Sequence, residues 1–403
     1  MVSRFSSKDF FLSLIIVTVT LGFAYHVAGH PMDFRVYHYG ARGVFDGTRP
    51  VYGRTSGLGW PMHYRYPPLF LLLFAPFAML PLSWGAAIWL ILKVGVLIWL
   101  VRAMQRAGAV LERPTTTTVL PGLLFIAPYL VEEFRYGNAQ FFIFALTAAA
   151  LLLARRKPLL AAGSLALAIS IKVWPLFFVP YLAVRRDWKV VSYAMVFIVA
   201  LALLPSFYFG VGRNFTLLNQ WFAQEFHTQL NKTEIWFPNQ SLRGFLMRYL
   251  TVIDYSSVPD SNYPQVNIAT FQPASVRLLW MILAGAIYLA FLILADKGKN
   301  GTGWVDHALG FCLLALLEPF TQKYALGVLL WPALTANSYL KDARVRILIY
   351  SGTVLALVQP FAPGASTQRL LQVLGLDFAA VSLLAAGIFI ACRATRHNTL
   401  MVQ

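Results

Sequence analysis

The sequence predicts an all-α membrane protein that crosses the bilayer many times. Hydrophobic residues make up 58% of the 403 residues and charged residues only 12%, whereas about 25% of the residues of a soluble domain are charged. Apolar runs recur along the whole chain, and short clusters of lysine and arginine separate them. A chain with so little polar surface needs the bilayer as its solvent, and helices satisfy their own backbone hydrogen bonds there.

The apolar runs are residues 10–28, 67–101, 119–131, 140–154, 158–171, 173–184, 190–209, 274–295, 307–317, 323–336, 345–362 and 376–392. A spanning helix needs about 20 residues, so the shorter runs predict broken helices or helices with polar ends. The run 67–101 is interrupted near Pro81. If both of its parts crossed the membrane, Arg102 and Arg106 would lie outside, so we expect it to cross once. About 12 crossings result, with both termini in the cytoplasm.

The formal charge of +17 comes mainly from basic clusters between the apolar runs. These clusters lie at residues 155–157, 185–189, 297–299, 341–346 and 393–396. Lysine and arginine accumulate on the cytoplasmic side of membrane proteins, so orientation explains the charge and nucleic-acid binding is disfavoured. The chain is therefore expected to form one integral membrane domain over residues 1–403, with long outer loops at 29–66 and 210–273.

The cysteine and histidine patterns predict no metal site, and no cofactor is expected. Cys312 and Cys392 both lie in apolar runs, which disfavours a disulfide framework. The spacing of His30, His38 and His63 fits no helical or ribbon set of metal ligands. We expect these histidines to lie at the membrane interface or to face a substrate.

The first outer loop is polar, and Asp33 opens its central stretch. Apolar or aromatic residues follow at positions 34, 37, 41 and 45, a spacing typical of an amphipathic helix on a membrane surface. Asp33 would lie at or near the start of this helix, and Gly47 follows its end. Two interpretations of Asp33 remain open, a helix N-cap and a functional carboxylate.

The same loop contains arginines, although basic residues usually lie on the cytoplasmic side. They are Arg35, Arg42, Arg49, Arg54 and Arg65. Arginine binds phosphate oxygens through a planar fork, so a lipid phosphate at the outer surface is a natural partner. Headgroup binding without chemistry is the alternative.

Lys172 interrupts the apolar sequence ISIKVWPL three residues before Pro175. An ionisable residue within a membrane segment is costly and indicates a functional site, with snorkelling to the interface as the alternative. Arg243 lies in SLRGFLMRYL, which is either part of a phosphate site or an interfacial amphipathic helix.

Six segments follow one another in an order that is typical of one enzyme family. They are DFRVYHYGARGVFDGTRPVYG (33–53), YRYPPLF (64–70), YGNAQFF (136–142), AISIKVWPLFFVPYLAVRRDW (168–188), PNQSLRGFLMR (238–248) and EPFTQKYALGVLLWP (318–332). The positions in the first that match the family pattern are Asp33, Tyr37, Gly47, Pro50 and Tyr52. The chain resembles the polyprenol-phosphate-sugar-dependent glycosyltransferases of the GT-C superfamily, and most closely glycosyltransferase family 87, which holds the mycobacterial phosphatidylinositol mannoside mannosyltransferases.

The resemblance implies a GT-C fold and an inverting, metal-independent transfer on the periplasmic side of a bacterial inner membrane. A polyprenyl-phosphate sugar would donate mannose or another hexose or pentose to a hydroxyl group on a lipid or glycan. A phosphate leaving group needs no acid, so one base suffices, and Asp33 is the candidate. Lys172, Arg65, Arg243 and Lys323 are candidates for binding the donor phosphate. The candidates for binding the sugar or the acceptor are Tyr37, His38, Tyr66, Asn138, Gln140, Asn239, Gln240, Glu318 and Gln322.

The last of the six segments departs from the family pattern. It has Glu318, Gln322, Lys323 and Tyr324 where the family often has the pattern S-P-x-x-W-x-H-H. Glu318 is therefore either a second acid near the site or the partner of a nearby arginine. The amide candidates have a structural alternative as well, because amides commonly cap helices or hydrogen-bond between them.

Other classes of protein explain fewer of these features. A membrane transporter would show a repeated pair of broken segments, and the second half of this chain does not repeat the first. A flippase of lipid-linked sugars, or a scaffold, accounts for the outer arginines but not for Asp33 together with the six ordered segments. A polysaccharide polymerase or ligase, which also uses lipid-linked sugars, remains a rival among enzymes.

Overall fold

The computed structural model describes residues 7–47, 50–53, 63–111, 116–226, 239–255, 263–297 and 303–401. Arg49 and Arg54 of the predicted first outer loop lie outside these ranges. Within the described residues, every regular element is an α-helix or a 3-10 helix. The all-α class predicted from composition is thereby confirmed.

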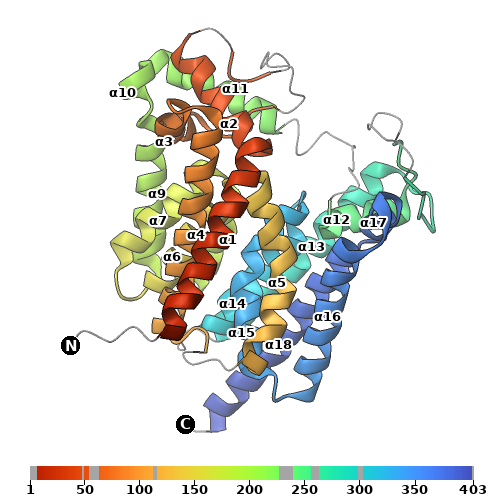
Figure 1. Ribbon diagram of the computed structural model, residues 1–403. Helices are drawn as coiled ribbons and strands as arrows, with labels where there is room; N and C mark the ends of the chain where they lie inside the picture. The colour runs from red at the N-terminus through yellow and green to blue at the C-terminus, as the bar shows by residue number, and fades with distance from the viewer. Residues whose placement is uncertain are drawn as a thin grey trace.

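The first half of the chain forms α1 (Ser7–Gly29), α2 (Met32–Phe45), α3 (Pro68–Ala78), α4 (Leu82–Arg106), α5 (Thr116–Tyr136), α6 (Gln140–Leu153), α7 (Pro158–Ile171), η1 (Trp174–Phe177), α8 (Phe178–Val184), α9 (Trp188–Leu203), α10 (Ser206–Phe209) and α11 (Val211–Phe226). The second half forms α12 (Leu242–Leu250), α13 (Pro273–Lys297), α14 (Trp304–Leu317), η3 (Lys323–Leu329), α15 (Leu330–Ala336), η4 (Asn337–Tyr339), α16 (Ala343–Phe361), α17 (Gly364–Leu374) and α18 (Leu376–Met401). The long helices lie side by side, and α2, α3, α10, α11, α12 and α17 gather at the end of the bundle away from both termini (Figure 1).

Four stretches of the described chain are long and apolar enough to cross a membrane. They are Leu82–Arg106, Trp188–Phe209, Pro273–Ala295 and Leu376–Arg396. Shorter apolar helices of 10–17 residues accompany them, among them α6, α7 and α14. A multi-pass helical membrane protein is therefore the class that the structure supports, while the count of about 12 crossings and the GT-C fold stay predictions.

Pro81 divides the run 67–101 as its position in the sequence suggests. Proline at the first helical position suits a helix start, and Pro68 begins α3 in this way. The 11 residues of α3 extend only about 16 Å, roughly half of the hydrocarbon thickness, whereas the 25 residues of α4 are enough to span it. Since α3 also lies beside α2 at the far end of the bundle (Figure 1), α4 is the part of this run that can cross.

Two antiparallel helices, α6 and α7, bring polar residues that are distant in the sequence to the same end of the helix pair. Each has 14 residues, and a short turn joins them, so the start of α6 at Gln140 lies at the same end as the finish of α7 at Ile171. Pro175 cannot donate a backbone hydrogen bond and its ring would clash with the carbonyl of Ile171, which ends the helix there. Lys172 then adopts an extended backbone and continues into η1.

The apolar side of α2 is buried inside the protein. The sequence predicted this helix and its apolar face but placed the face on the membrane surface. In the structure Phe34, Tyr37 and Ala41 are almost wholly inaccessible, because other helices of the protein cover them. Their aromatic rings pack against Phe74 and Trp89 of α3 and α4. This packing holds the polar start of α2 against the turn between the end of α5 and the start of α6.

Candidate active site

Asp33 lies in the first turn of α2 and is directed into the protein. Its side chain is 7% exposed, and its Oδ2 accepts a hydrogen bond of 2.6 Å from Nδ2 of Asn138, 105 positions along the chain. The residue at the N-cap of α2 is Pro31, and no side chain makes a capping hydrogen bond there. The carboxylate of Asp33 therefore contacts the turn between α5 and α6 and does not serve as the N-cap considered from the sequence.

The turn that presents Asn138 is shaped by Gly137. Its φ of +69° is in the left-handed region, where a side chain is disfavoured. A Cβ at this position would also lie 3.0 Å from Cβ of Phe34. Glycine thus allows α2 to approach the turn closely enough for Asn138 to reach Asp33.

A network of hydrogen bonds determines how the amide of Asn138 is oriented. Its Oδ1 accepts hydrogen bonds from the backbone N–H of Gln140 at 2.8 Å and from the hydroxyl of Tyr66 at 3.3 Å. The Tyr66 hydroxyl also lies 2.9 Å from that of Tyr37. With Oδ1 engaged by donors, Nδ2 is left to donate to the Asp33 carboxylate.

Lys172 joins this group from the end of α7. Its Nζ donates a 3.0 Å hydrogen bond to Oε1 of Gln140, and its charge interacts with Glu318, Arg65, Glu225 and Asp33. We use the term Asp33 cluster for Asp33, Tyr37, Tyr66, Asn138, Gln140 and Lys172. The cluster combines one buried carboxylate, one ammonium group and several neutral hydrogen-bonding groups.

Burial raises the pKa of Asp33, while the hydrogen bond from Asn138 and the charges of Lys172 and Lys93 oppose that increase. A carboxylate with a raised pKa is a stronger base than an ordinary aspartate. Glu318 lies in the loop that follows α14, where burial raises its pKa to about 7 against the opposing effect of Lys172. Two acidic groups of the site thus titrate above their usual range.

Arg65 is held by an acidic partner from another part of the chain. Its Nε and Nη2 donate to the two carboxylate oxygens of Glu225 at 3.1 and 3.0 Å. Gln224 donates to the carbonyl oxygen of Tyr64 at 2.8 Å, and Trp221 donates to that of Arg65 at 3.2 Å. The last turns of α11 therefore bind the segment that leads into α3 and carries Tyr66.

Asn239 and Gln240 have structural contacts beside the site. Asn239 donates to the carbonyl oxygen of Pro319 at 3.0 Å and accepts from the N–H of Thr321 at 3.0 Å. The backbone N–H of Gln240 donates to Thr321 at 2.7 Å, and its side chain donates to Gln372 at 2.9 Å. These bonds attach the start of α12 to α17 through Gln372 and to the loop 318–322, which contains Glu318 and Gln322.

The remaining candidates point elsewhere. Lys323 donates to Gln359 of α16, and the guanidinium of Arg243 lies 5.5 Å from the ring centre of Trp280. Nε2 of His38 lies 2.9 Å from the carbonyl oxygen of Leu80, and burial lowers the pKa of this histidine. These contacts are made with residues outside the Asp33 cluster, and the assignment of the three side chains to substrate stays a prediction.

The comparison with known families agrees with the resemblance of the six segments. The sequence model of "Glycosyltransferase family 87" matches residues 64–319, well over half of the chain. The chain belongs to glycosyltransferase family 87. Asn138, Gln140 and Lys172 lie within the matched range, whereas Asp33 precedes it, so the inclusion of Asp33 in the site depends on its hydrogen bond with Asn138.

Two curated relatives bear the same name, "Polyprenol-phosphate-mannose-dependent alpha-(1-2)-phosphatidylinositol mannoside mannosyltransferase". The chain is 28% identical to the Mycobacterium tuberculosis protein over 197 residues, which cover 43% of this chain and 45% of that protein. It is 29% identical to the Mycolicibacterium smegmatis protein over 175 residues, 39% of each chain. The matched part spans less than half of the length of each relative.

Sequence reasoning missed a buried ion pair next to the site of this family 87 protein. Nζ of Lys93 in α4 lies 2.9 Å from Oε1 of Glu133 in α5, and both side chains are fully buried. Lys93 interrupts the apolar run 67–101, so the rule that singled out Lys172 applied to it as well. Glu225, the partner of Arg65, was also missed, and no local pattern in the sequence marks it.

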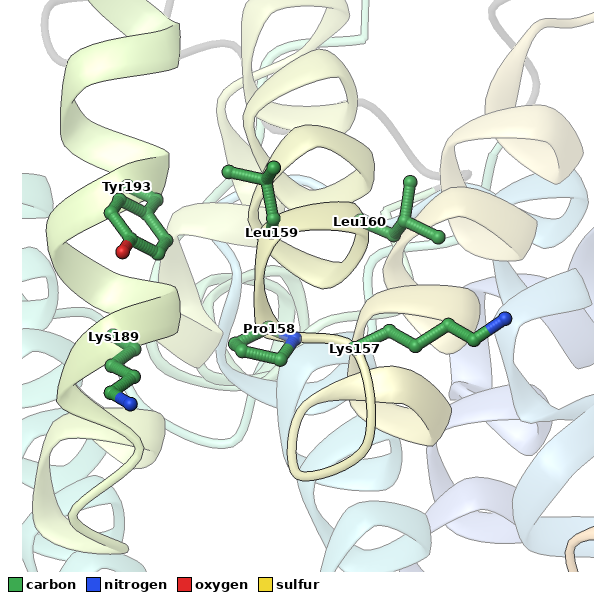
Figure 2. A pocket seen from close by; sticks show the side chains of 6 residues that line it. All are labelled: Lys157, Pro158, Leu159, Leu160, Lys189 and Tyr193. Atoms are coloured by element: carbon green, nitrogen blue, oxygen red, sulfur yellow. The ribbon is translucent and has the colours of Figure 1, made fainter.

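A hollow of about 370 Å³ lies at the other end of α7. It is lined by Lys157, Pro158, Leu159, Leu160, Lys189 and Tyr193. Figure 2 shows the side chains of Lys157 and Lys189 on opposite sides of Pro158. The 14 residues of α7 separate this hollow from Lys172 by about 21 Å, so it is not part of the candidate active site.

Proposed function

We propose that this family 87 protein transfers a sugar from a polyprenyl-phosphate donor to a hydroxyl group of a lipid or glycan acceptor. The sugar is mannose or another hexose or pentose, and the reaction takes place on the periplasmic side with inversion at the anomeric carbon. The buried Asp33 carboxylate beside the Lys172 ammonium group is the observation that supports this function most directly. The polyprenol-phosphate mannose named for the relatives supports the choice of donor.

Asp33 is the proposed general base. The acceptor oxygen attacks the anomeric carbon and forms the new C–O bond, while its proton passes to the Asp33 carboxylate. Asn138 holds that carboxylate through a 2.6 Å hydrogen bond, and burial raises the pKa of Asp33. Both effects suit a base, because the first fixes its orientation and the second makes proton transfer more favourable.

Lys172 is the proposed partner of the leaving group. The bond between the anomeric carbon and the phosphate oxygen breaks with its electron pair on the oxygen, so negative charge develops on the polyprenyl phosphate. A preorganised cation stabilises such charge, and no metal ion or general acid is needed for a leaving group that is a stable anion. The hydrogen bond from Lys172 to Gln140 orients the ammonium group before the donor binds.

Arg65 is the proposed second contact of the donor phosphate. Its guanidinium group is engaged by Glu225 in a bidentate ion pair. A donor phosphate would therefore compete with Glu225 for Arg65. Tyr37, Tyr66, Asn138 and Gln140 are the proposed ligands of the sugar or acceptor hydroxyls, since they form the hydrogen-bond network of Asn138, which holds the same carboxylate.

The Asp33→Asn variant tests this function, with Asp46→Asn as the matched control. Asp46 follows the same helix but is exposed and lies 3.8 Å from Arg42. With a radiolabelled polyprenyl-phosphate mannose and a membrane lipid extract as acceptor, we expect Asp33→Asn to reduce transfer roughly 100- to 10,000-fold, which is the contribution of one general base. Asp46→Asn should transfer at the wild-type rate.

Near wild-type transfer by Asp33→Asn would show that the mechanism is wrong. If instead the wild-type protein moves the lipid-linked sugar across vesicles without transferring it, the flippase interpretation replaces the enzymatic one. Mass spectrometry of the lipid that co-purifies with the protein identifies the donor independently, and a bound polyprenyl-phosphate hexose or pentose is the expected result.

A further inference from the structure

The Lys93–Glu133 ion pair lies next to the Asp33 cluster, at the start of α6. The mechanism proposed above does not use it. Nζ of Lys93 donates to Oε1 of Glu133 at 2.9 Å and to the backbone carbonyl of the same residue at 3.0 Å. Both side chains are 0% exposed. Water therefore does not reach the pair and cannot take over its hydrogen bonds.

This pair is linked to the turn that presents Asn138. Oε1 of Glu133 also accepts a 2.9 Å hydrogen bond from the backbone N–H of Phe141 in the first turn of α6. Asn138 precedes that turn and bonds to the N–H of Gln140. Glu133 and Asn138 thus satisfy neighbouring N–H groups at the start of α6, groups that have no partner within the helix.

The chemistry of the pair favours a functional purpose over a purely structural one. Oε2 of Glu133 is buried and has no hydrogen-bond partner among the described residues. Well-packed apolar residues often stabilise a protein as well as a buried ion pair does. A buried pair that leaves one carboxylate oxygen unsatisfied is therefore a poor device for stability alone.

We propose that the Lys93–Glu133 pair is a positioning unit, which fixes the start of α6 and thereby holds Asn138 against the Asp33 carboxylate. The inference rests on the proposed function, because it assumes that the geometry of Asp33 matters. Lys93 and Glu133 do not touch the reacting atoms and act through the turn. Without the bond from Phe141 to Glu133, the turn loosens and the hydrogen bond from Asn138 to Asp33 weakens.

A weaker hydrogen bond to Asp33 has a measurable consequence. Asn138 stabilises the charged form of Asp33, so its loss raises the pH at which Asp33 becomes deprotonated. The charged groups that act on Asp33 are Lys93, Glu133 and Lys172. The tyrosines that face it are Tyr37, Tyr66, Tyr136 and Tyr324, and they remain neutral in this range. A fair test must therefore keep the net charge at positions 93 and 133 constant.

Two double variants meet that requirement. Lys93→Gln/Glu133→Gln removes both charges but keeps an amide oxygen that accepts from the Phe141 N–H. Lys93→Met/Glu133→Leu removes both charges and the acceptor, and fills the space with apolar groups. The two proteins have equal net charge, so a difference in Asp33 between them reports on the hydrogen bond and the turn.

The titration of Asp33 is followed by infrared difference spectroscopy of the whole chain in lipid nanodiscs. The carboxyl band that disappears in Asp33→Asn identifies the residue. We expect the Gln/Gln protein to titrate as the wild type does, and the Met/Leu protein to titrate about one pH unit higher, because a hydrogen bond to a charged group is worth at least that much. The acid limb of kcat/KM for sugar transfer should move by the same amount.

Equal Asp33 titration in the two double variants would overturn the proposal. If the Met/Leu protein does not fold, Lys93→Gln/Glu133→Leu replaces it, since a glutamine at position 93 retains a donor for the backbone carbonyl of residue 133. Since the infrared measurement needs no turnover, an upward shift in a protein that transfers no sugar would sustain the positioning pair and refute the proposed function. If the wild-type protein transfers sugar but Asp33 titrates alike in the two double variants, the proposed function stands and the positioning pair is refuted.

Discussion

Replacing Asn138 by alanine removes the group that donates to the Asp33 carboxylate. The lost contacts are the 2.6 Å bond from Nδ2 to Asp33 and the bonds that Oδ1 accepts from Tyr66 and Gln140. Asp33 itself remains in the first turn of α2, which is held by the packing of Phe34. The variant therefore perturbs the protonation of the proposed base with little change in its position.

The size of the effect follows from the kind of hydrogen bond. A bond to a charged group contributes about 1.5–3 kcal/mol, and a change of one pKa unit corresponds to about 1.4 kcal/mol. Asn138 lowers the pKa of Asp33, which burial has raised. Its removal should therefore move the acid limb of kcat/KM upward by about one to two pH units. Activity at a pH below the limb then falls by about ten-fold for each unit of the shift.

The assay is the pH dependence of sugar transfer at limiting donor concentration, with Asn337→Ala as the matched control. Asn337 is also a buried asparagine with a two-sided hydrogen-bond network, because it accepts from Gly122 and donates to Val119. We expect its variant to keep the wild-type pH profile. An acid limb that stays in place in Asn138→Ala, with transfer otherwise measurable, would refute the assignment of Asp33 as the titrating base.

Three further substitutions test separate parts of the site. Glu225→Gln should lower the donor KM about two- to five-fold at unchanged kcat, since it releases Arg65 from an ion pair that is partly exposed and so worth at most about 1 kcal/mol. Lys172→Met should reduce kcat/KM at least 100-fold, because a preorganised group at the leaving oxygen contributes roughly 100- to 1000-fold. Gly137→Ala should destabilise the protein by about 1–2 kcal/mol through its positive φ and its contact with Phe34, and should also slow transfer.

Each substitution has a control that shares its chemistry. Glu132→Gln disrupts a comparable ion pair with Arg135 and should leave the donor KM unchanged. Lys189→Met, at the hollow of Figure 2, should leave transfer unchanged. Gly108 has a φ of +72°, and a Cβ added there would meet nothing within 4 Å, so Gly108→Ala isolates the backbone cost from crowding. If a control changes transfer as much as its test variant, the assignment of that residue fails.

Local patterns in the sequence were sufficient for the class, the family and several elements. Composition and the apolar runs indicated helices in a membrane, and the six ordered segments indicated family 87. The spacing at 34, 37 and 41 located the buried face of α2, and Pro81 located the break between α3 and α4. These features depend on neighbours within a few positions of the chain, where periodicity and the chemistry of proline act directly.

Only the tertiary structure decided which side chains meet. The sequence alone could not distinguish a capping Asp33 from one bound to Asn138, because that bond joins residues 105 positions apart. The same holds for Arg65 with Glu225, 160 positions away, and for Lys93 with Glu133. Helix packing sets these contacts, and it depends on the shapes of many side chains at once. Sequence therefore named most of the polar residues of the candidate site, and packing determined which of them lie together and which bind structural partners instead.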